Sequence, residues 1–598
     1  MLELHGMKAR KRDRKSMIKK LASAVREYKR QTIATPLFMV GEVAMEAIIP
    51  LIMKWMIERG IEAGSMQNIW LYGGLLLLAA MVSLTSGVMS GRMAAVASSG
   101  FARNLRHDMF YRIQDYSFSN IDRFSTSSII TRLTTDVTNV QNSFQMILRM
   151  AVRAPLMIIF SLVSAMMINA RVSMIFVYTI PVLGFGIYFI MSRTHPIFKR
   201  VFQTYDKLNN VVQENLRGIR VVKSYVREDY ETEKFNGISG SICRDFISAE
   251  RRIAFMNPLM MGCVYFCTLA ISWLGAKAII ASGNNPAAGM TTGDLTALIS
   301  YVTQILGSLM MLSFTFLMIV MSRASAQRII EVLDEKTDIV SPENARTEIP
   351  DGSIDFDHVN FNYASRSERD TLSDIDIHIP SGAVVGILGG TGSGKTSLVQ
   401  LIPRLYDVKD GAVRVGGIDT REYDLTALRD SVSMVLQKNE LFSGTIKDNL
   451  RWGNENATDE EIEEACRLAQ ADPFIRDFPD KYDTWIEQGG TNVSGGQKQR
   501  LCIARALLKK PKILILDDST SAVDTKTDAM IRAGFRSYIP DTTKLIIAQR
   551  VASVKDADMI IVLDNGKIAD IGTHDELMAR CEIYREVHDS QTKGGEVA

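Results

Sequence analysis

Gly389-Gly390-Thr391-Gly392-Ser393-Gly394-Lys395-Thr396 is the stretch that decides the fold of the C-terminal half of this chain. It matches the pattern G-x-x-x-x-G-K-[ST]. The apolar run at 383–388 predicts a buried strand before it, and residues 397–402 predict a helix after it. Between a strand and a helix, such a loop cradles phosphate oxygens with its backbone N–H groups. We therefore expect Lys395 to reach the β- and γ-phosphates of a nucleotide and the Thr396 hydroxyl to hold Mg²⁺.

A second apolar run, residues 513–516, ends in an acidic residue, Asp517. This pattern predicts a buried strand with a carboxylate at its C-terminal end, the place from which an acid holds Mg²⁺ next to a phosphate-binding loop. From residue 352 onward, short β-rich runs alternate with helical patterns and turn signals. The C-terminal part is therefore predicted to be an α/β nucleotide-binding domain of the P-loop type.

The N-terminal half carries six long apolar stretches. They cover residues 33–57, 68–96, 144–168, 172–192, 253–282 and 297–322. Each has about the 20 residues that are needed to cross the hydrocarbon core of a bilayer. The alternative, buried helices of a soluble protein, does not account for so many such runs. We therefore predict an all-α transmembrane domain with six spans.

Charge between the spans predicts their orientation. The segments between the second and third spans and between the fourth and fifth spans are rich in Arg and Lys, whereas residues 283–296 contain none. The positive-inside rule places both long segments, both termini and the nucleotide-binding domain in the cytoplasm. The two segments are mostly helix-compatible, so the spans are expected to continue as helices beyond the membrane. Breaks at 117–126 and 217–222 predict short transverse helices that dock on the nucleotide-binding domain near Gln437.

Overall composition argues against nucleic acid as a partner, because the net charge of the 598 residues is only +2. A basic cluster before residue 21 is more typical of an anchor beside anionic lipid headgroups than of an RNA-binding tail, and residues 16–30 suit an interfacial helix. The six cysteines form no C-x-x-C pair. We expect them to be reduced thiols that serve as small apolar side chains, rather than disulfides or metal ligands.

A polar, proline-bearing stretch separates the two halves near residues 326–350. The predicted organisation is a cytoplasmic N-terminal segment at 1–30, the six-span transmembrane domain at 31–325, a linker at 326–350 and the nucleotide-binding domain at 351–598. The predicted fold class is therefore an all-α six-helix transmembrane domain followed by an α/β P-loop domain.

Between the two nucleotide motifs lies Val493-Ser494-Gly495-Gly496-Gln497, which resembles the signature sequence of ATP-binding-cassette (ABC) transporters. With it, essentially the whole chain resembles an ABC exporter half-transporter of the multidrug or lipid type. The resemblance implies ATP and Mg²⁺ as cofactors and ATP hydrolysis coupled to transport across the cell membrane. It also implies that two cassettes close head to tail on two ATPs. Each ATP then lies between the P-loop of one chain and the signature of the other.

The resemblance also assigns roles by position. Tyr363 matches the aromatic residue that stacks on adenine, Gln437 matches the glutamine that touches Mg²⁺, and Asp524 lies in the loop that crosses the dimer interface. The residues expected to contact ATP are Tyr363, Gly389, Gly390, Thr391, Gly392, Ser393, Gly394, Lys395, Thr396, Ser397, Gln437, Ser494, Gly495, Gly496, Gln497 and Asp524. Those expected at the metal are Thr396, Gln437 and Asp517.

Two positions depart from the family pattern. The family usually has a glutamate, which acts as the general base, directly after the Walker B aspartate, the position of Asp517 here. In this chain the next residue is Asp518, whose shorter side chain is expected to fall short of the attacking water. The switch loop usually carries histidine, and here it carries Gln549, which has no titratable proton. Both are therefore weak, non-consensus catalytic candidates. The chain resembles the degenerate-site subunit of a heterodimer, whose intact signature serves the competent site of a second ABC half-transporter.

The substrate is left open by the sequence. The leading hypothesis is export of small amphipathic molecules, either drugs or lipids. The alternatives are a homodimeric exporter with slow hydrolysis, a siderophore-type importer and a regulatory subunit that does not transport, whereas a soluble cassette protein is excluded by the six spans. Glu42 and Glu46 in the first span, and Arg149 and Arg153 in the third, are each spaced i, i+4. They either line a pathway or pair with one another, or the two arginines lie near the cytoplasmic end of their span and extend to the membrane interface.

Overall fold

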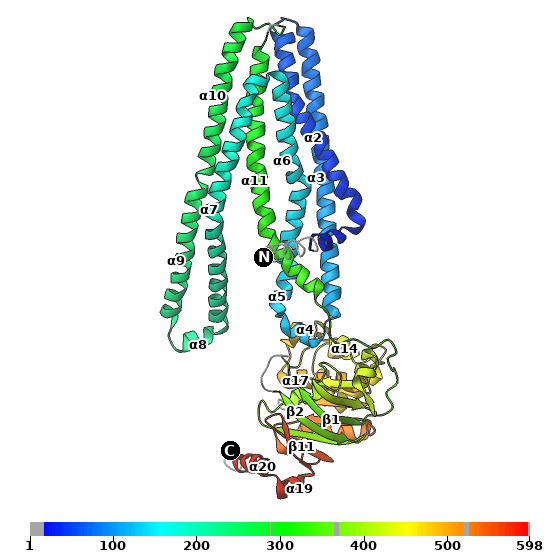
Figure 1. Cartoon of the computed structure of the whole chain (residues 1–598). Coiled ribbons are helices and arrows are strands. Elements are labelled where there is room, and N and C mark those ends of the chain that lie inside the picture. Colours follow the sequence, from blue (N-terminus) through cyan, green and yellow to red (C-terminus); the bar gives the residue numbers. More distant parts are fainter. Residues whose placement is uncertain (1–16, 288, 364–369, 519–524, 596–598) are drawn as a thin grey trace. The chain divides into compact units, whose positions relative to one another are not determined.

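The computed structural model describes residues 17–287, 289–363, 370–518 and 525–595. The chain forms two compact units, which we treat separately (Figure 1). The helical unit comprises Met1–Gln114 and Thr126–Glu335, and the mixed unit comprises Asp115–Ser125 and Lys336–Ala598. The segment at Asp115–Ser125 is thus grouped with the C-terminal part of the chain, although it lies between two helices of the N-terminal part.

Long helices make up the helical unit. Their bounds are η1 Arg26–Tyr28, α2 Lys29–Met56, η2 Ile57–Ile61, α3 Met66–Gln114, α5 Thr126–Thr131, η3 Arg132–Asp136, α6 Val137–Ile168, α7 Ala170–Arg217, α8 Ile219–Ser224, α9 Glu228–Ile253, α10 Met256–Ser282 and α11 Thr292–Asp334. Among the described residues, six helical stretches are long and apolar enough to cross a membrane, which confirms the predicted number of spans. Several extend well beyond a bilayer: the 49 residues of α3 correspond to roughly 70 Å of helix, against a hydrocarbon core of about 30 Å.

Two short helices stand where the sequence predicted breaks in the long ones. The first is α4, Phe118–Arg123, which begins with a capping box between Ser117 and Asn120. The second is α8, which follows Gly218 at the end of α7. The expectation that α4 and α8 dock near Gln437 stays a prediction. Within the mixed unit, the partners of α4 include Tyr406 and Asp338, whereas the side chain of Gln437 is directed to Asp518.

An ion-pair cluster joins two of the apolar helices. Arg153 of α6 pairs with both Glu42 and Glu46 of α2, and its Nη2 lies 2.7 Å from Glu46 Oε2. These side chains are shielded, with 21% of Arg153 and 11% of Glu42 exposed. Arg149 lies one turn earlier beside Gly91, and the described residues give it no ion pair. The contacts therefore support structural pairing for Arg153 and leave the role of Arg149 open.

The described residues of the mixed unit form three sheets. Strands β1 Ile354–Phe361, β2 Leu372–Ile379, β4 Asp410–Val415 and β5 Ile418–Asp419 form one with order β2-β1-β4-β5; the largest has order β12-β11-β3-β10-β9-β6, and β7 pairs with β8. The remaining strands are β3 Val384–Gly389, β6 Val432–Val435, β7 Gly444–Thr445, β8 Trp485–Ile486, β9 Ile513–Asp517, β10 Thr543–Ile547, β11 Met559–Asp564 and β12 Lys567–Gly572. The helices are α12 Lys395–Gln400, α13 Leu425–Ser431, α14 Ile446–Arg451, α15 Asp459–Leu468, α16 Asp472–Arg476, α17 Gly495–Leu508, α18 Thr525–Tyr538, α19 His574–Arg580 and α20 Glu582–Gly595, with short turns η4 Thr420–Glu422, η5 Lys481–Asp483, η6 Gln488–Gly490 and η7 Val551–Ser553. An α/β domain thus follows an all-α domain, which confirms the predicted fold class.

The six-stranded sheet positions the candidate site. Strands β3, β10, β9 and β6 are parallel, and every residue of β9 and β10 is buried. Such strands read as continuous apolar runs because both faces of the sheet are covered. In the register, Ile547 at the end of β10 stands opposite both Ile387 of β3 and Asp517 of β9. The loops that leave these three strands therefore emerge at one edge, where ligands bind in parallel α/β sheets.

The cysteines agree with the sequence-based expectation that they form no disulfide. All six are free, and five of them are buried. Cys243 differs, because it is exposed and does not act as a buried apolar side chain.

The Arg153 cluster yields a stability prediction. Arg153→Met leaves two shielded glutamates without their cation, which should destabilise the protein by about 3–5 kcal/mol. Arg149→Met makes the same chemical change one helical turn away, where no ion pair is lost, and should cost much less. Thermal unfolding of both variants in detergent measures the difference. Equal melting temperatures for the two variants would show that the cluster does not stabilise the fold.

Candidate functional site

Two glycines of the loop between β3 and α12, Gly389 and Gly394, have no room for a side chain. Gly389 has φ 156°, and a Cβ there would lie 2.2 Å from the carbonyl oxygen of Leu563. Gly394 has φ 96°, and a Cβ there would lie 2.7 Å from Leu372. Any larger residue would thus collide with neighbouring strands. The conformation leaves the backbone N–H groups of the loop at the start of α12, a geometry that suits an anion.

Two polar groups in this loop are poised for a ligand. Lys395 Nζ lies 2.8 Å from the carbonyl oxygens of Gly389 and Gly390, so the loop's own backbone holds the ammonium group. Burial lowers the pKa of Lys395, although Asp517 and Asp518 oppose the shift. The hydroxyl oxygen of Ser393, a residue only 4% exposed, has no hydrogen-bond partner among the described residues. A buried polar atom of this kind is costly unless a partner such as a phosphate oxygen reaches it.

The acidic edge of the site follows β9. Asp517 is 2% exposed, and its Oδ1 accepts a hydrogen bond of 3.2 Å from the Thr396 hydroxyl. Burial and the charge of Asp518 raise the pKa of Asp517, while Thr396 and Lys395 oppose the shift. A hydroxyl next to a carboxylate is a donor set that Mg²⁺ accepts when phosphate oxygens and water complete its octahedron. The described residues contain no group of three or more His, Cys, Asp or Glu that would hold a metal without such help.

Asp518 lies beside the two glutamines that the sequence selected. Its Oδ2 lies 2.8 Å from Gln549 Nε2 and 3.4 Å from Gln437 Nε2. Its backbone has φ 49°, and its N–H donates to the carbonyl of Ile547. Burial raises the pKa of Asp518, and the two amides oppose the shift. The structure thus brings the two non-consensus residues into direct contact and places the expected metal-site glutamine beside them.

Tyr363 presents a half-exposed ring close to α12. Its hydroxyl lies 2.8 Å from Ser397 Oγ and 3.0 Å from Gln400 Oε1. Tyr406, which sequence reasoning missed, packs against this ring edge-to-face, with centroids 5.0 Å apart and planes at 89°. No motif marks Tyr406. Its place in a turn soon after the phosphate-loop helix is the only sequence signal that points to it.

The signature stretch, residues 493–497, lies at the N-terminus of helix α17 and is not part of the loop between β3 and α12. Ser494 begins α17, and a capping box links its side chain and backbone N–H to Gln497. Ser494 and Gly495 are exposed, and nothing lies within 4 Å of a Cβ added at Gly495. The hydrogen bonds between Ser494 and Gln497 thus close on this stretch and leave its helix start open to a ligand from outside. The remaining predicted contact, Asp524, lies outside the described residues.

Comparison with known proteins identifies relatives over almost the whole length. The model of the ABC transporter transmembrane region matches residues 32–309, and the ABC transporter model matches residues 372–521. An uncharacterized ABC transporter ATP-binding protein of Bacillus subtilis, YfiB, is 36% identical over 93% of this chain and 95% of its own length. An ATP-dependent lipid A-core flippase of Desulfotalea psychrophila is 29% identical over 96% of this chain and 100% of its own. The solved structure of a bacterial Atm1-family ABC exporter with ATP bound has the same fold, with a TM-score of 0.80, 22% identity and coverage of 94% and 98%.

The crowded carboxylates predict a stability gain. Asp517→Asn removes a buried charge next to Asp518 and should stabilise the nucleotide-free protein by about 1 kcal/mol, or roughly 2 °C in melting temperature. A carboxyl group whose pKa is raised on folding contributes stability that is fully present below its unfolded pKa and lost as pH rises through its folded pKa. The gain should therefore be larger at pH 8 than near pH 4. Melting curves at both pH values provide the measurement, with Asp564→Asn, an exposed carboxylate at the end of β11, as control.

Proposed function

Because this chain belongs to the ABC transporter family, we propose that it is one half of a heterodimeric exporter of small amphipathic molecules. It is a multi-pass membrane protein with an ATP-hydrolysing cassette. The charge of the segments between its spans supports a cytoplasmic position for both termini and the cassette. Lipids are the favoured cargo class over drugs, because one relative that spans the whole chain is a lipid A-core flippase.

The residues of the site would meet the nucleotide in sequence, from its adenine to its phosphates and the metal ion. Tyr363 offers its exposed ring face to adenine, and Ser393 and Lys395 serve the phosphates. When a nucleotide enters, Lys395 exchanges the carbonyls of Gly389 and Gly390 for phosphate oxygens, which keeps its charge satisfied throughout. Thr396, Gln437 and Asp517 would hold Mg²⁺, which neutralises phosphate charge when it is bound.

The contact between Asp518 and Gln549 is the observation that carries the proposal of a degenerate site. An aspartate reaches about 1.5 Å less far than a glutamate, and the backbone bond to Ile547 fixes where Asp518 starts. Its carboxylate is already a hydrogen-bond acceptor for Gln549 and Gln437. An amide in the switch loop donates a hydrogen bond but neither takes up nor releases a proton at neutral pH. This arrangement favours ATP binding without hydrolysis.

The open signature of this chain supports the second half of the proposal. The start of α17 at Ser494 and Gly495 is exposed, and nothing lies within 4 Å of a Cβ added at Gly495, so an anion carried by another subunit would meet the helix N-terminus directly. A partner cassette with a complete catalytic set would then complete its competent site with this signature. The homodimeric exporter, the siderophore-type importer and the regulatory subunit remain alternatives, and none has an observation of its own in its favour.

We predict opposite sensitivities for Asp518 and Gly495 in the assembled transporter. Asp518→Asn keeps the shape and removes basicity, so steady-state ATPase activity should fall less than twofold, whereas loss of a true general base costs about 10²–10⁴-fold. Gly495→Asp places a negative charge where the partner's nucleotide phosphate would lie and should abolish nearly all activity. Gly495→Asn is the neutral control of the same size, and nothing in this chain obstructs either side chain. If Asp518→Asn inactivates as thoroughly as Gly495→Asp, the site is competent.

Restoring the family residues should have the reverse effect. This chain alone is expected to bind ATP and to hydrolyse it slowly. The double variant Asp518→Glu with Gln549→His should raise the turnover of the purified chain by at least tenfold, because both a base of full length and a titratable switch residue are present. Each single variant should gain less, since the two side chains touch. Unchanged turnover in the double variant would place the cause of slow hydrolysis elsewhere.

A further inference from the structure

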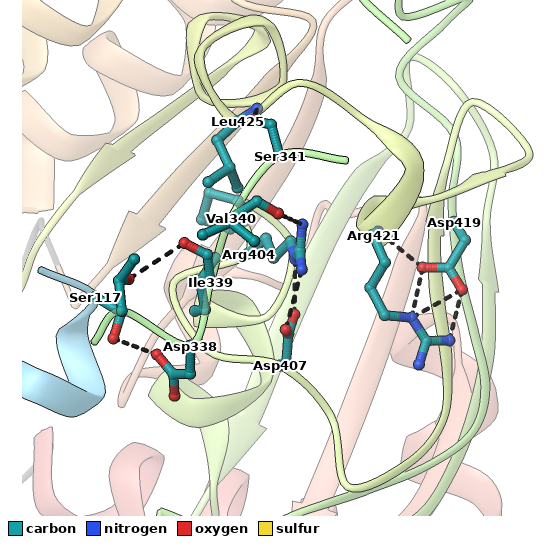
Figure 2. Close-up of polar contacts among 12 residues, drawn as sticks. Ser117, Asp338, Ile339, Val340, Ser341, Arg404, Asp407, Asp419, Arg421 and Leu425 are labelled. Atoms are coloured by element: carbon teal, nitrogen blue, oxygen red, sulfur yellow. Dashed lines mark hydrogen bonds and ion pairs between the residues drawn. The ribbon is translucent and has the colours of Figure 1, made fainter. Parts of the chain in front are cut away.

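The short helix α4 is anchored on residues 336–338, where the C-terminal part of the chain enters the mixed unit. The hydroxyls of Ser117 and Ser119 both donate to the carboxylate of Asp338, the second at 2.8 Å (Figure 2 shows Ser117 and Asp338). Asn120 Nδ2 donates to the carbonyl of Lys336 at 3.1 Å. Although burial alone would raise it, these hydroxyls and two backbone N–H groups hold the pKa of Asp338 below its usual value. Asp338 therefore stays ionised at neutral pH and keeps α4 in place.

A turn after α12 holds the same entering segment. Arg404 donates to the carbonyl of Val340 at 3.2 Å and to Asp407 at 2.7 Å, as Figure 2 shows. The Ser341 hydroxyl accepts from the backbone N–H of Leu425 at 3.0 Å. Arg404 is only 6% exposed and has a positive φ of 51°. A residue in this conformation persists where its surroundings hold it, so the turn at 404–407 is a fixed platform.

Tyr406 projects from this platform and contacts both α4 and the candidate adenine residue. Its hydroxyl donates to Asp122 Oδ2 of α4 at 2.6 Å, and its ring meets Phe118 of α4 edge-to-face at 6.0 Å. The same ring packs against Tyr363 at 5.0 Å. Tyr406 is 9% exposed, and its hydroxyl is thus largely removed from water. One side chain therefore connects Tyr363 with α4, the short helix that lies between α3 and α5 in the sequence.

We propose that Tyr406 is a positioning residue that couples nucleotide binding at Tyr363 to the placement of α4. The inference rests on the proposed role of Tyr363 at adenine. A nucleotide that fixes the Tyr363 ring also fixes the ring packed against it, and the hydrogen bond carries that restraint to Asp122. Because coupling between two sites is reciprocal, a well-placed α4 must also favour nucleotide binding. In the sequence, α4 lies between α3 and α5 and is separated from each by only a few residues. A restraint on α4 therefore acts on two helices of the transmembrane domain.

A purely structural role makes a different prediction. If Tyr406 only fills space, the ring is what matters, and Tyr406→Phe preserves everything except the hydroxyl. If Tyr406 couples the two sites, removal of the hydroxyl breaks the connection while the packing against Tyr363 survives. Tyr423 supplies a matched control within the same unit. It is a buried tyrosine whose hydroxyl donates to the carbonyl of Val415 at 2.8 Å, far in the sequence from α4 and from the loop.

The experiment uses the full chain in lipid nanodiscs. The affinity for a fluorescent ATP analogue is titrated, and hydrogen–deuterium exchange is followed in peptides covering Asp115–Ser125 with and without ATP. The variants are Tyr406→Phe, Asp122→Ala, their double variant, Tyr363→Ala and Tyr423→Phe. In the unaltered chain, ATP should slow exchange across α4. Tyr406→Phe and Asp122→Ala should each abolish this slowing and lower ATP affinity about two- to fivefold, a modest coupling. The double variant should be no weaker than the weaker single variant.

The outcomes separate this inference from the proposed function. Unchanged ATP affinity in Tyr363→Ala would refute the adenine role on which the coupling rests, whereas the proposed degenerate site, which rests on the contact between Asp518 and Gln549, would stand. If Tyr363→Ala loses affinity but Tyr406→Phe keeps the ATP-dependent protection of α4, the coupling is overturned and the nucleotide site stands. The coupling is also overturned if ATP leaves α4 exchange unchanged in the unaltered chain, or if Tyr423→Phe has the same effect as Tyr406→Phe.

Discussion

The register of three parallel strands is the constraint on which the site depends. Ile547 stands opposite both Ile387 and Asp517, so β9 and β10 end level with one another and β3 ends two residues further on. A shift of one residue would move a chain by about 3.3 Å and reverse the faces of its side chains. The apolar residues of β9 and β10 oppose such a shift because both faces are buried. Packing of these apolar side chains, which take no part in the chemistry, thus sets the distances between the polar side chains of the site: a lysine, two aspartates and a glutamine.

Features written in short, contiguous patterns were predictable from the sequence. The phosphate loop, the apolar spans and the short helix at 118–123 each follow from local periodicity or from glycine placement. Contacts between distant residues were not. No local signal indicates that Tyr406 would donate to Asp122, 284 positions away, or that Asp338 would hold Ser117. The break at 117–126 indicates where a short helix forms but not which residues that helix contacts.

The candidate site combines preserved and altered parts in a physically consistent way. Closed glycine positions and a buried, unpartnered Ser393 hydroxyl favour tight phosphate binding. At the far side, the Gln549 amide donates a hydrogen bond to Asp518, the carboxylate that we propose to be a poor general base. Affinity and turnover are separate properties, because the first depends on the ground state and the second on groups that act only in the transition state. On our proposal, the site is therefore well formed for ATP binding and poorly formed for hydrolysis.

The Arg153 cluster limits how the transmembrane helices can move. Sliding α2 past α6 by one helical turn displaces the charges by about 5.4 Å. Because Glu42 and Glu46 lie one turn apart, that displacement would leave Arg153 with one of its two partners and the other glutamate unpaired in the apolar helix, where an unpaired charge is very costly. Tilting the two helices together leaves every contact intact. The helices α2 and α6 thus move together as one rigid body and resist sliding past each other. Any opening of the helical unit must therefore take place between other helices.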